Sequence, residues 1–316
     1  MTFDLLCKLL KERNDFLILT HKRPDGDTLG SAAALCRILR TLGKRACVLP
    51  NSGATARYDF LLGGLLAPED FAPACIVAVD IADEALLPPE AEAFRGRTDI
   101  CIDHHPSNTR YAAALYLEGE AAAVGEVIFK LYKTFGIAPD VKILEAIYVS
   151  VATDTGCFRF SNTTALAHSI AAECISAGVD FHRLNVEFFD SKSPARFKIE
   201  RAVFDSLRFF CGGRAAVARL TQKDIAAAGA GVDDLDNLAS LLMQISTIHI
   251  ASLLQENADG SWKVSVRSRA PVSASDICLS FGGGGHPRAA GCTMHGDAEG
   301  CTAQLGNAFE RALANV

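Results

Sequence analysis

Two short stretches of the sequence bring histidine and aspartate together. In the first, His21 precedes Asp25 and Asp27, which are separated by one glycine; the second is Asp103-His104-His105. Carboxylates that share a buried site repel one another unless a cation lies between them. Imidazole and carboxylate together suit a divalent metal, and this many carboxylates suggest more than one ion. The residues therefore predict metal-dependent hydrolysis of a phosphate ester.

Short apolar runs indicate the elements that position these side chains. Runs in the first half predict strands at 16–20, 45–49, 75–80 and 99–103. Helical patterns follow at 28–42, 121–135, 140–153 and 163–177. Strands that are apolar throughout and separated by helices indicate an α/β domain with a parallel sheet covered on both faces. Ligands bind at the carboxyl ends of such strands, and the loop after Thr20, Asp80 and Asp103 all fall there.

The second half of the chain has a different pattern. Further strands are expected at 214–220, 248–254, 262–267 and 291–295, two of them with the alternation of half-exposed strands. Helices are expected at 234–244, 273–281 and 301–314. Ser193-Pro194 is typical of a helix start. We therefore expect a first domain at 1–189, a linker helix at 190–208 and a smaller α+β domain at 209–316.

Several of the acidic residues admit a second interpretation. Asp80 ends an apolar strand, so it either bridges two metal ions or caps the next turn. Asp154 closes a helix and opens a loop rich in Thr, Gly and Asn, for which an ordinary polar loop is the alternative. Asp27 could cap the helix that follows it, which would leave His21 idle. Arg159, just beyond Asp154, either contacts a phosphate or base or caps a helix end.

The segment Asp103-His104-His105 is a more specific signal. Two adjacent histidines after an acid, at the end of a strand, rarely arise for packing reasons. One imidazole could ligate a metal ion while the other donates to a phosphate oxygen. Asp103 could accept a proton from a neighbouring imidazole and orient it.

A glycine run near the end of the chain is the second strong motif. Gly282–Gly285 exposes backbone N–H groups and lets a ligand approach closely, and His286 offers a donor to an anion. The run lacks the Lys-Ser/Thr ending of a nucleotide P-loop. Arg267 and Arg269 lie upstream on a predicted strand and could form a phosphate fork. The alternative interpretation is a flexible hinge.

Composition excludes several classes of protein. The net charge of -6 argues against binding of long duplex nucleic acid through a basic face. No apolar run reaches the roughly 18 residues that span a bilayer, and residues 1–12 lack the pattern of a signal peptide. A cytoplasmic protein without a membrane partner is therefore expected. The 11 cysteines form no Cys-x-x-Cys pair, which indicates buried reduced thiols rather than a zinc site.

The ordered motifs resemble those of a known family. His21-Lys-Arg-Pro-Asp-Gly-Asp-Thr-Leu-Gly-Ser31, Asp80, Asp103-His104-His105 and Thr153-Asp154 resemble the four motifs of the DHH phosphoesterases. Phe281-Gly-Gly-Gly-Gly-His-Pro-Arg-Ala-Ala-Gly291 resembles the signature of the associated DHHA1 domain. The resemblance covers essentially the whole chain, and the layout is most similar to the nanoRNase/pAp phosphatase branch. It implies a mainly parallel five-stranded sheet covered by helices in the first domain.

The resemblance also implies a centre of two Mn²⁺ ions, with Mg²⁺ or Co²⁺ as substitutes. One ion would be held by His21, Asp25 and Asp80, and the other by Asp27, Asp80, His104 and Asp154. Asp80 would be the bridge, and a water between the ions would attack phosphorus in line. His105 would contact the scissile phosphate, with Asp103 beside it.

The second domain would bind the remainder of the substrate, so that cleavage takes place between the domains. Arg267 and His286 would bind its other phosphate or 5′ end. The full set of candidate substrate-binding residues is Arg159, Arg267, Arg269, Gly283, Gly284, Gly285 and His286. One segment departs from the family pattern: 244–254 lacks a Glu-Gly-Val-like start and has His249 there, which bears on substrate preference.

The activity that follows is hydrolysis of short oligoribonucleotides to 5′-mononucleotides and removal of the 3′-phosphate of pAp. One alternative is a phosphodiesterase for linear dinucleotides such as pApA or pGpG in cyclic-dinucleotide turnover. Another is a nucleotide sensor without catalysis. An inorganic pyrophosphatase would share the metal motifs, but the glycine-histidine segment and the arginines favour a nucleotide-sized substrate. A homodimer is left open.

Overall fold

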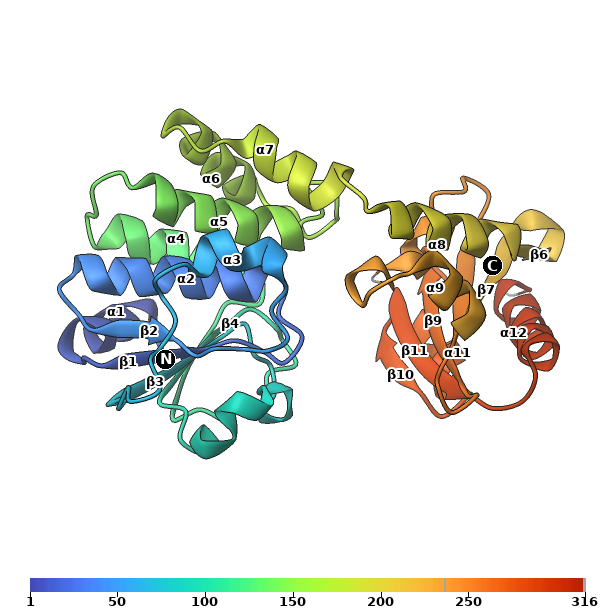
Figure 1. Cartoon of the computed structure of the whole chain (residues 1–316), viewed down its shortest axis with the longest axis horizontal. Coiled ribbons are helices and arrows are strands. Elements are labelled where there is room, and N and C mark those ends of the chain that lie inside the picture. Colours follow the sequence, from blue (N-terminus) through green and yellow to red (C-terminus); the bar gives the residue numbers. More distant parts are fainter. Residues whose placement is uncertain (236, 315–316) are drawn as a thin grey trace. The chain divides into compact units, whose positions relative to one another are not determined.

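The computed structural model describes residues 1–235 and 237–314 and divides into two compact units, Met1–Ser191 and Lys192–Val316 (Figure 1). Each unit has its own sheet and its own hydrophobic core. Position 236, inside one predicted helix, and the last two positions of the second predicted domain lie outside the described residues. Within the described part of the chain, no helix is both long and apolar enough to cross a membrane.

The first unit alternates strands and helices along the chain. Its strands are β1 (Phe16–Leu19), β2 (Ala46–Val48), β3 (Cys75–Val79), β4 (Ile100–Asp103) and β5 (Ala114–Leu117). Its α-helices are α1 (Phe3–Glu12), α2 (Gly26–Thr41), α3 (Asp59–Leu62), α4 (Val124–Thr134), α5 (Val141–Asp154), α6 (Ala165–Ser176) and α7 (Phe181–Asn185). The strands and helices predicted for this region are present, with their ends shifted by a few residues.

The five strands of the first unit form one parallel sheet, which confirms the predicted α/β fold. Their order is β2-β1-β3-β4-β5, and every neighbouring pair is parallel. The chain order reverses beside β1, because β1 pairs with both β2 and β3. Parallel sheets bind ligands at the carboxyl ends of the strands beside such a reversal. The loop after β1 and the ends of β3 and β4 therefore share one edge of the sheet.

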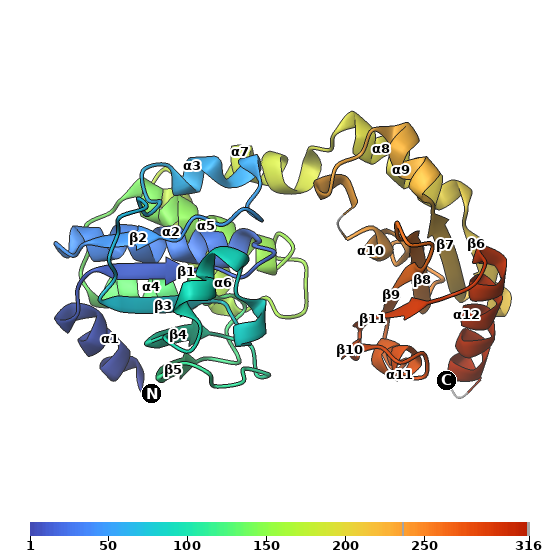
Figure 2. The same ribbon diagram turned by 60° about the horizontal axis from the view of Figure 1, so that its bottom comes forward.

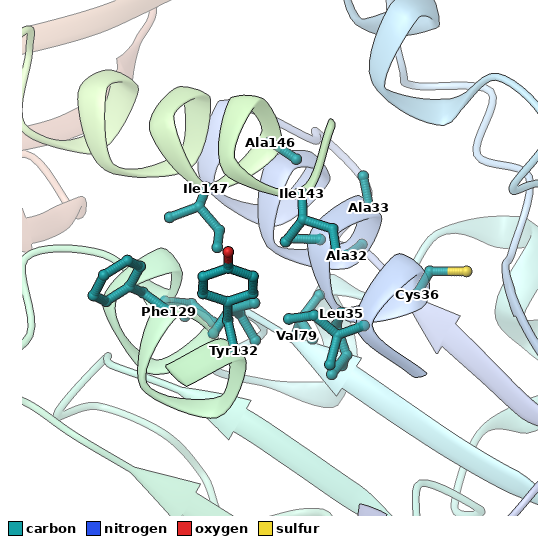
Figure 3. Packing of buried hydrophobic residues seen from close by; sticks show 14 of the residues in the cluster. Ala32, Ala33, Leu35, Cys36, Val79, Phe129, Tyr132, Ile143, Ala146 and Ile147 are labelled. Carbon is teal, nitrogen blue, oxygen red and sulfur yellow. The ribbon is translucent and has the colours of Figure 1, made fainter. Parts of the chain in front are cut away.

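Helices cover one face of this sheet. Leu35 of α2 packs near Val79 of β3, and Ile143 of α5 packs on α2 from the other side (Figure 3). The two helices come close because Gly30 has no side chain: a Cβ there would lie 2.4 Å from the carbonyl oxygen of Ala146. The opposite face is covered by loops and by the 3₁₀ helices η2 (Glu84–Leu86) and η3 (Pro89–Phe94) rather than by α-helices.

The second unit is a mixed sheet with helices on both faces, as expected of an α+β domain. Its strands are β6 (Arg208–Phe210), β7 (Ala215–Leu220), β8 (Ile250–Glu256), β9 (Trp262–Ser268), β10 (Gly284–His286) and β11 (Ala289–Met294). Its α-helices are α8 (Pro194–Asp205), α9 (Gln222–Ala228), α10 (Leu238–Leu242), α11 (Ala274–Leu279) and α12 (Ala298–Leu313). The order is β10-β11-β9-β8-β7-β6, with only β7 and β8 parallel. Helices α11 and α12 pack on one face, and α8 to α10 on the other (Figure 2).

Two expectations for the second unit are corrected. The helix predicted at 234–244 is replaced by a 3₁₀ turn, Asp233–Leu235, and the short α10, because Asn237 has a φ of 50°. The last helix begins earlier than predicted, at Ala298, since the side chain of Asp297 caps it by accepting from the N–H of Gly300 at 2.7 Å. The cysteines are all free thiols, as predicted.

Candidate metal centre

The loop after β1 and the first turn of α2 carry three candidate ligands. Asp25 caps α2, because its Oδ1 accepts from the backbone N–H groups of Asp27 at 3.1 Å and Thr28 at 3.2 Å. The interpretation of Asp27 as the cap is therefore wrong; Asp27 lies inside the first turn, fully buried. His21 is not idle, since its Nε2 lies 3.6 Å from Asp25 Oδ1.

Asp80 directly follows β3, at the middle of the sheet edge. Its φ of 60° is in the left-handed region, which non-glycine residues adopt mainly at strained or functional positions. Its two carboxylate oxygens face different partners: Oδ2 lies 3.6 Å from His21 Nε2, and Oδ1 lies 3.5 Å from His104 Nε2. The side chain is 4% exposed. Asp80 thus stands between two sets of side chains.

The end of β4 fixes the orientation of both imidazoles. Buried Asp103 accepts from the backbone N–H of His104 at 2.8 Å and pairs its Oδ1 with His105 Nδ1 at 2.8 Å. Its other oxygen accepts from Asn108 Nδ2 at 2.6 Å. His104 Nδ1 lies 3.0 Å from the carbonyl oxygen of Ala121, which leaves Nε2 for the neighbouring carboxylates. Sequence reasoning missed Asn108 and Ala121, because no motif marks either.

The last residue of α5 completes the cluster. Asp154 Oδ2 and Asp27 Oδ2 each lie 3.7 Å from His104 Nε2. Among the described residues, three groups of side chains could each hold a metal ion, because the ligand atoms within a group lie within 4.8 Å of one another. The groups are His21, Asp25 and Asp80; Asp27, His104 and Asp154; and Asp80, His104 and His105. The structure therefore brings together all the side chains that the sequence predicted as metal ligands.

A set of hydrogen-bond donors that the sequence did not indicate surrounds Asp27. Its Oδ1 accepts from Ser150 Oγ at 2.5 Å and from Ser31 Oγ at 3.0 Å, and Oδ2 accepts from the N–H of Val124 at 2.8 Å. The N–H of Gly125 adds a longer contact of 3.3 Å to Oδ1. The first turn of α4 therefore points its free N–H groups at this carboxylate, and α2, α4 and α5 all help to fix its position.

The carboxylates of the cluster are buried and close to one another, and both conditions shift their pKa values. Burial raises the pKa of Asp80 well above its usual range, and the charge of Asp27 raises it further. Burial and the same charge raise the pKa of Asp154 to about 7. Burial alone would lower the pKa of His21, but the carboxylates of Asp25 and Asp80 outweigh it and raise that pKa to about 10. The contact with Asp103 raises the pKa of His105.

This arrangement fits divalent cations. Among the described residues, Asp80 Oδ1 is a buried oxygen that accepts no hydrogen bond, although buried polar atoms are normally paired. Burial raises the pKa values of Asp27, Asp80 and Asp154, so that their charged forms are disfavoured without a cation beside them. A hard or borderline cation with oxygen and imidazole ligands would satisfy the orphaned oxygen and separate the like charges.

The remaining candidates divide between contacts within the chain and open positions. Arg159 is exposed, and its Nε donates to the carbonyl oxygen of Gly156 at 2.7 Å. Arg269 donates to the carbonyl oxygens of Ser246 at 3.0 Å and Met243 at 2.6 Å, so it anchors the segment before β8. Arg267 is half-buried on β9, and its Nη1 donates to the carbonyl oxygen of Val266 at 3.1 Å.

The second half of the glycine run lies in a strand, since β10 begins at Gly284, pairs antiparallel with β11 and ends at exposed His286. Packing alone accounts for Gly283, where a Cβ would lie 2.2 Å from the carbonyl oxygen of Gly291. It also accounts for Gly285, where a Cβ would lie 2.7 Å from the Cα of Ala290. At Gly284 a Cβ would meet no atom within 4 Å, so packing does not explain that glycine.

Comparison with known proteins identifies the family. The model of the DHH family, N-terminal domain, matches residues 15–153, and the DHHA1 domain matches 212–315. The chain is 32% identical over 316 residues to the bifunctional oligoribonuclease and PAP phosphatase NrnA of Thermus thermophilus, covering 99% of this chain and 92% of that protein.

Solved structures share the fold. An exopolyphosphatase-related protein from Bacteroides fragilis superposes with a TM-score of 0.85 at 22% identity, over 98% of this chain and 95% of that one. RecJ from Thermus thermophilus, solved in complex with Mn²⁺, has a TM-score of 0.55 at 16% identity, over 99% of this chain and 55% of that one.

Fold and site together define a metal-dependent phosphoesterase: a parallel sheet whose carboxyl edge gathers histidines and aspartates, joined in sequence to a mixed-sheet unit with a glycine-histidine strand. The chain belongs to the DHH family of phosphoesterases, with a DHHA1 domain as its second part.

Proposed function

We propose that this chain is a two-metal, Mn²⁺-dependent phosphoesterase. It hydrolyses short oligoribonucleotides to 5′-mononucleotides and removes the 3′-phosphate of pAp. The relative from Thermus thermophilus carries both activities in its name and aligns over 99% of this chain. RecJ, which shares the fold, was solved with Mn²⁺ and also with Mg²⁺, and manganese is the ion that we propose.

The observation that carries the proposal is that the two carboxylate oxygens of Asp80 face different candidate ligands. One oxygen faces His21 at 3.6 Å and the other faces His104 at 3.5 Å, each within a separate group of candidate ligands. Two groups that share one carboxylate favour two neighbouring cations over one. When bound, the ions would stabilise the charge of the phosphate and lower the pKa of water. His21, Asp25 and Asp80 would hold one, and Asp27, Asp80, His104 and Asp154 the other.

His105 is proposed to contact the scissile phosphate. Asp103 Oδ1 lies 2.8 Å from His105 Nδ1 and orients the ring, and this contact raises the pKa of His105. A cationic imidazole stabilises the charge that develops on a phosphate oxygen. In this proposal His105 donates to the phosphate, and Asp103 acts through it as a positioning residue.

The second unit is proposed to bind the substrate's other phosphate. Exposed His286 and half-buried Arg267 offer donors to an anion, and the open space at Gly284 allows close approach to its backbone. Arg269 is less suited to this task, because its guanidinium is already engaged by two carbonyl oxygens. Arg159 is retained as a proposed substrate contact because its side chain is exposed on the loop that follows Asp154.

The test is a turnover assay with Mn²⁺, using pAp, pApA and a labelled RNA series from dinucleotides to long oligomers. Fast release of mononucleotides from the shortest RNAs and of phosphate from pAp, falling with RNA length, is the expected result. Asp80→Ala is expected to abolish turnover, while Lys198→Ala on the exposed part of α8 serves as a matched surface control.

The other outcomes each contradict part of the proposal. Strong activity on pApA alone would indicate a role in cyclic-dinucleotide turnover instead of the proposed role on short RNA and pAp. Binding of nucleotides without turnover of any substrate would make it a sensor. Near-normal activity of Asp80→Ala at low Mn²⁺ would refute the two-metal arrangement.

A further inference from the structure

An exposed aromatic ring lies on the loop that follows the metal centre. Phe160 is 52% exposed and belongs to the segment between α5, which ends at Asp154, and α6. The family motifs do not include it, and none of the activities proposed above uses it. An isolated exposed aromatic residue needs no explanation by itself, so the construction of the loop decides whether this one has a function.

The loop is tied to the metal centre by several hydrogen bonds. Asn162 Nδ2 donates to the carbonyl oxygen of Asp154 and to that of Ala122, both at 3.1 Å. The N–H of Phe160 donates to the carbonyl oxygen of Thr155 at 3.0 Å. These hydrogen bonds tie the backbone of the loop to the end of α5, where the candidate ligand Asp154 lies.

One face of the ring is occupied by glycine. A Cβ on Gly156 would lie 2.4 Å from Cζ of Phe160 and 2.5 Å from both Cε atoms. Nearly equal distances to three adjacent ring carbons place that point over the face of the ring rather than beyond its edge. Gly156 also has a φ of 56°, which glycine adopts without strain. Glycine at 156 therefore lets the ring lie flat on the backbone, and the exposed area belongs mainly to the opposite face.

The packing of this loop does not depend on Phe160. The ring of Phe158 stacks on His168 with a centroid distance of 5.3 Å and meets Tyr148 at 6.1 Å, so it anchors the loop to the core. Phe160 takes part in neither of these ring contacts and remains 52% exposed. An exposed aromatic face on a loop that begins at a candidate metal ligand offers a surface on which a base can stack.

We propose that the exposed face of Phe160 stacks on a nucleobase of the substrate whose phosphate lies at the metal centre. The inference rests on the proposed function and narrows its substrate class to phosphoesters that carry a base. Stacking tolerates any base, because every base presents a π face. The site would then select nucleotides over inorganic or sugar phosphates without selecting among sequences.

The experiment compares two substrates that differ only in the base: adenosine 3′,5′-bisphosphate and ribose 3,5-bisphosphate. Phe160→Ala should lower kcat/KM about 5- to 150-fold for the nucleotide and leave the value for the ribose compound unchanged. Phe160→Trp should restore the nucleotide value, whereas Phe160→Leu, which is apolar but has no π face, should not. Phe181→Ala, a truncation of another exposed phenylalanine on α7, is the control and should change neither value.

Fluorescence of Phe160→Trp separates the inference from the proposed function. If the wild-type protein turns over neither compound, the proposed function fails, yet quenching of the introduced tryptophan by adenosine 3′,5′-bisphosphate, beyond the change seen in wild type, still supports stacking. Equal losses of Phe160→Ala on both compounds, a rescue by leucine, or no quenching would overturn the inference. A change of oligomeric state in Phe160→Ala would also overturn it, because the ring would then belong to an interface.

Discussion

Ser150→Ala tests how the metal centre is held together, because it removes one donor and leaves the candidate ligands in place. Ser150 Oγ donates to Asp27 Oδ1 at 2.5 Å, which is shorter than the contacts that Ser31, Val124 and Gly125 make to this carboxylate. Its hydroxyl also lies 3.2 Å from that of Ser31, so the two serines form a pair behind Asp27. Both are fully buried, and water has no access to replace the lost donor.

The expected loss of Mn²⁺ affinity follows from the hydrogen bonds that Asp27 keeps in the variant. Removing a residue that orients a metal ligand typically lowers metal affinity about 10- to 100-fold. Ser31 and the N–H of Val124 still hold Asp27 in the variant, so the lower end is expected. A 10-fold loss corresponds to about 1.4 kcal/mol. The double variant Ser31→Ala/Ser150→Ala should approach the upper end, because Oδ1 then keeps only the long contact to Gly125.

The assay is titration of the chelated protein with Mn²⁺ by calorimetry, with circular dichroism to verify the fold. Ser169→Ala is the matched control: its exposed hydroxyl donates to the carbonyl oxygen of Ala165 on its own helix, away from the cluster. Mn²⁺ affinity in that variant should equal wild type. If both Ser150→Ala and the double variant bind Mn²⁺ as tightly as wild type, the reasoning that these hydroxyls position Asp27 is refuted.

Three further predictions concern pH, packing and substrate contact. Mn²⁺ should raise the Tm of the chelated protein more at pH 8 than at pH 6, measured by scanning fluorimetry. The pKa values of His21, about 10, and of Asp154, about 7, in the folded protein both lie above their values in the unfolded chain. Protonation of these groups therefore stabilises the ion-free fold at low pH, and this stabilisation is lost as the pH rises through the folded pKa values. An equal rise in Tm at both pH values would contradict this. Gly30→Ala should lower the free energy of unfolding in urea by about 1–3 kcal/mol, because the new methyl overlaps a backbone carbonyl of α5; an unchanged midpoint would argue against the close contact. Arg269→Ala should lower the unfolding free energy and leave KM for pAp within about twofold, because its donors are bound to backbone carbonyls; a KM raised more than about tenfold would return it to the substrate contacts.

Much of the first unit could be predicted because buried parallel strands are apolar throughout. Phe16–Leu19 and Cys75–Val79 are fully buried, and each ends where a polar cluster begins. β5 escaped prediction because Ala114–Leu117 is a short edge strand that is only half-buried. In the second unit, the break at Asn237 depends on a left-handed backbone that a periodic apolar pattern does not reveal.

The candidate ligands could be predicted because parallel strands end at the same edge of a sheet. Asp80 and Asp103 were expected to meet, and the structure brings His104 within 3.5 Å of Asp80. The partners of the ligands could not be predicted. Ser150 reaches Asp27 only because α5 packs on α2, and Asn108 reaches Asp103 through the turn after β4. Such contacts arise from tertiary packing and leave no motif.

The order of the ligands along the chain also bears on how the first unit matures. His21 and Asp154 lie at opposite ends of the segment that builds the sheet and α5, and Asp80 and His104 lie between them. Contacts that link residues so distant in sequence form slowly, because the chain must first be closed over long loops. We therefore expect the full set of candidate ligands to assemble late in folding, so that a divalent ion would stabilise the folded unit rather than start its folding. When metal is scarce, we expect a first unit that has folded but is less stable at the carboxyl edge of its sheet, rather than a chain that fails to start folding.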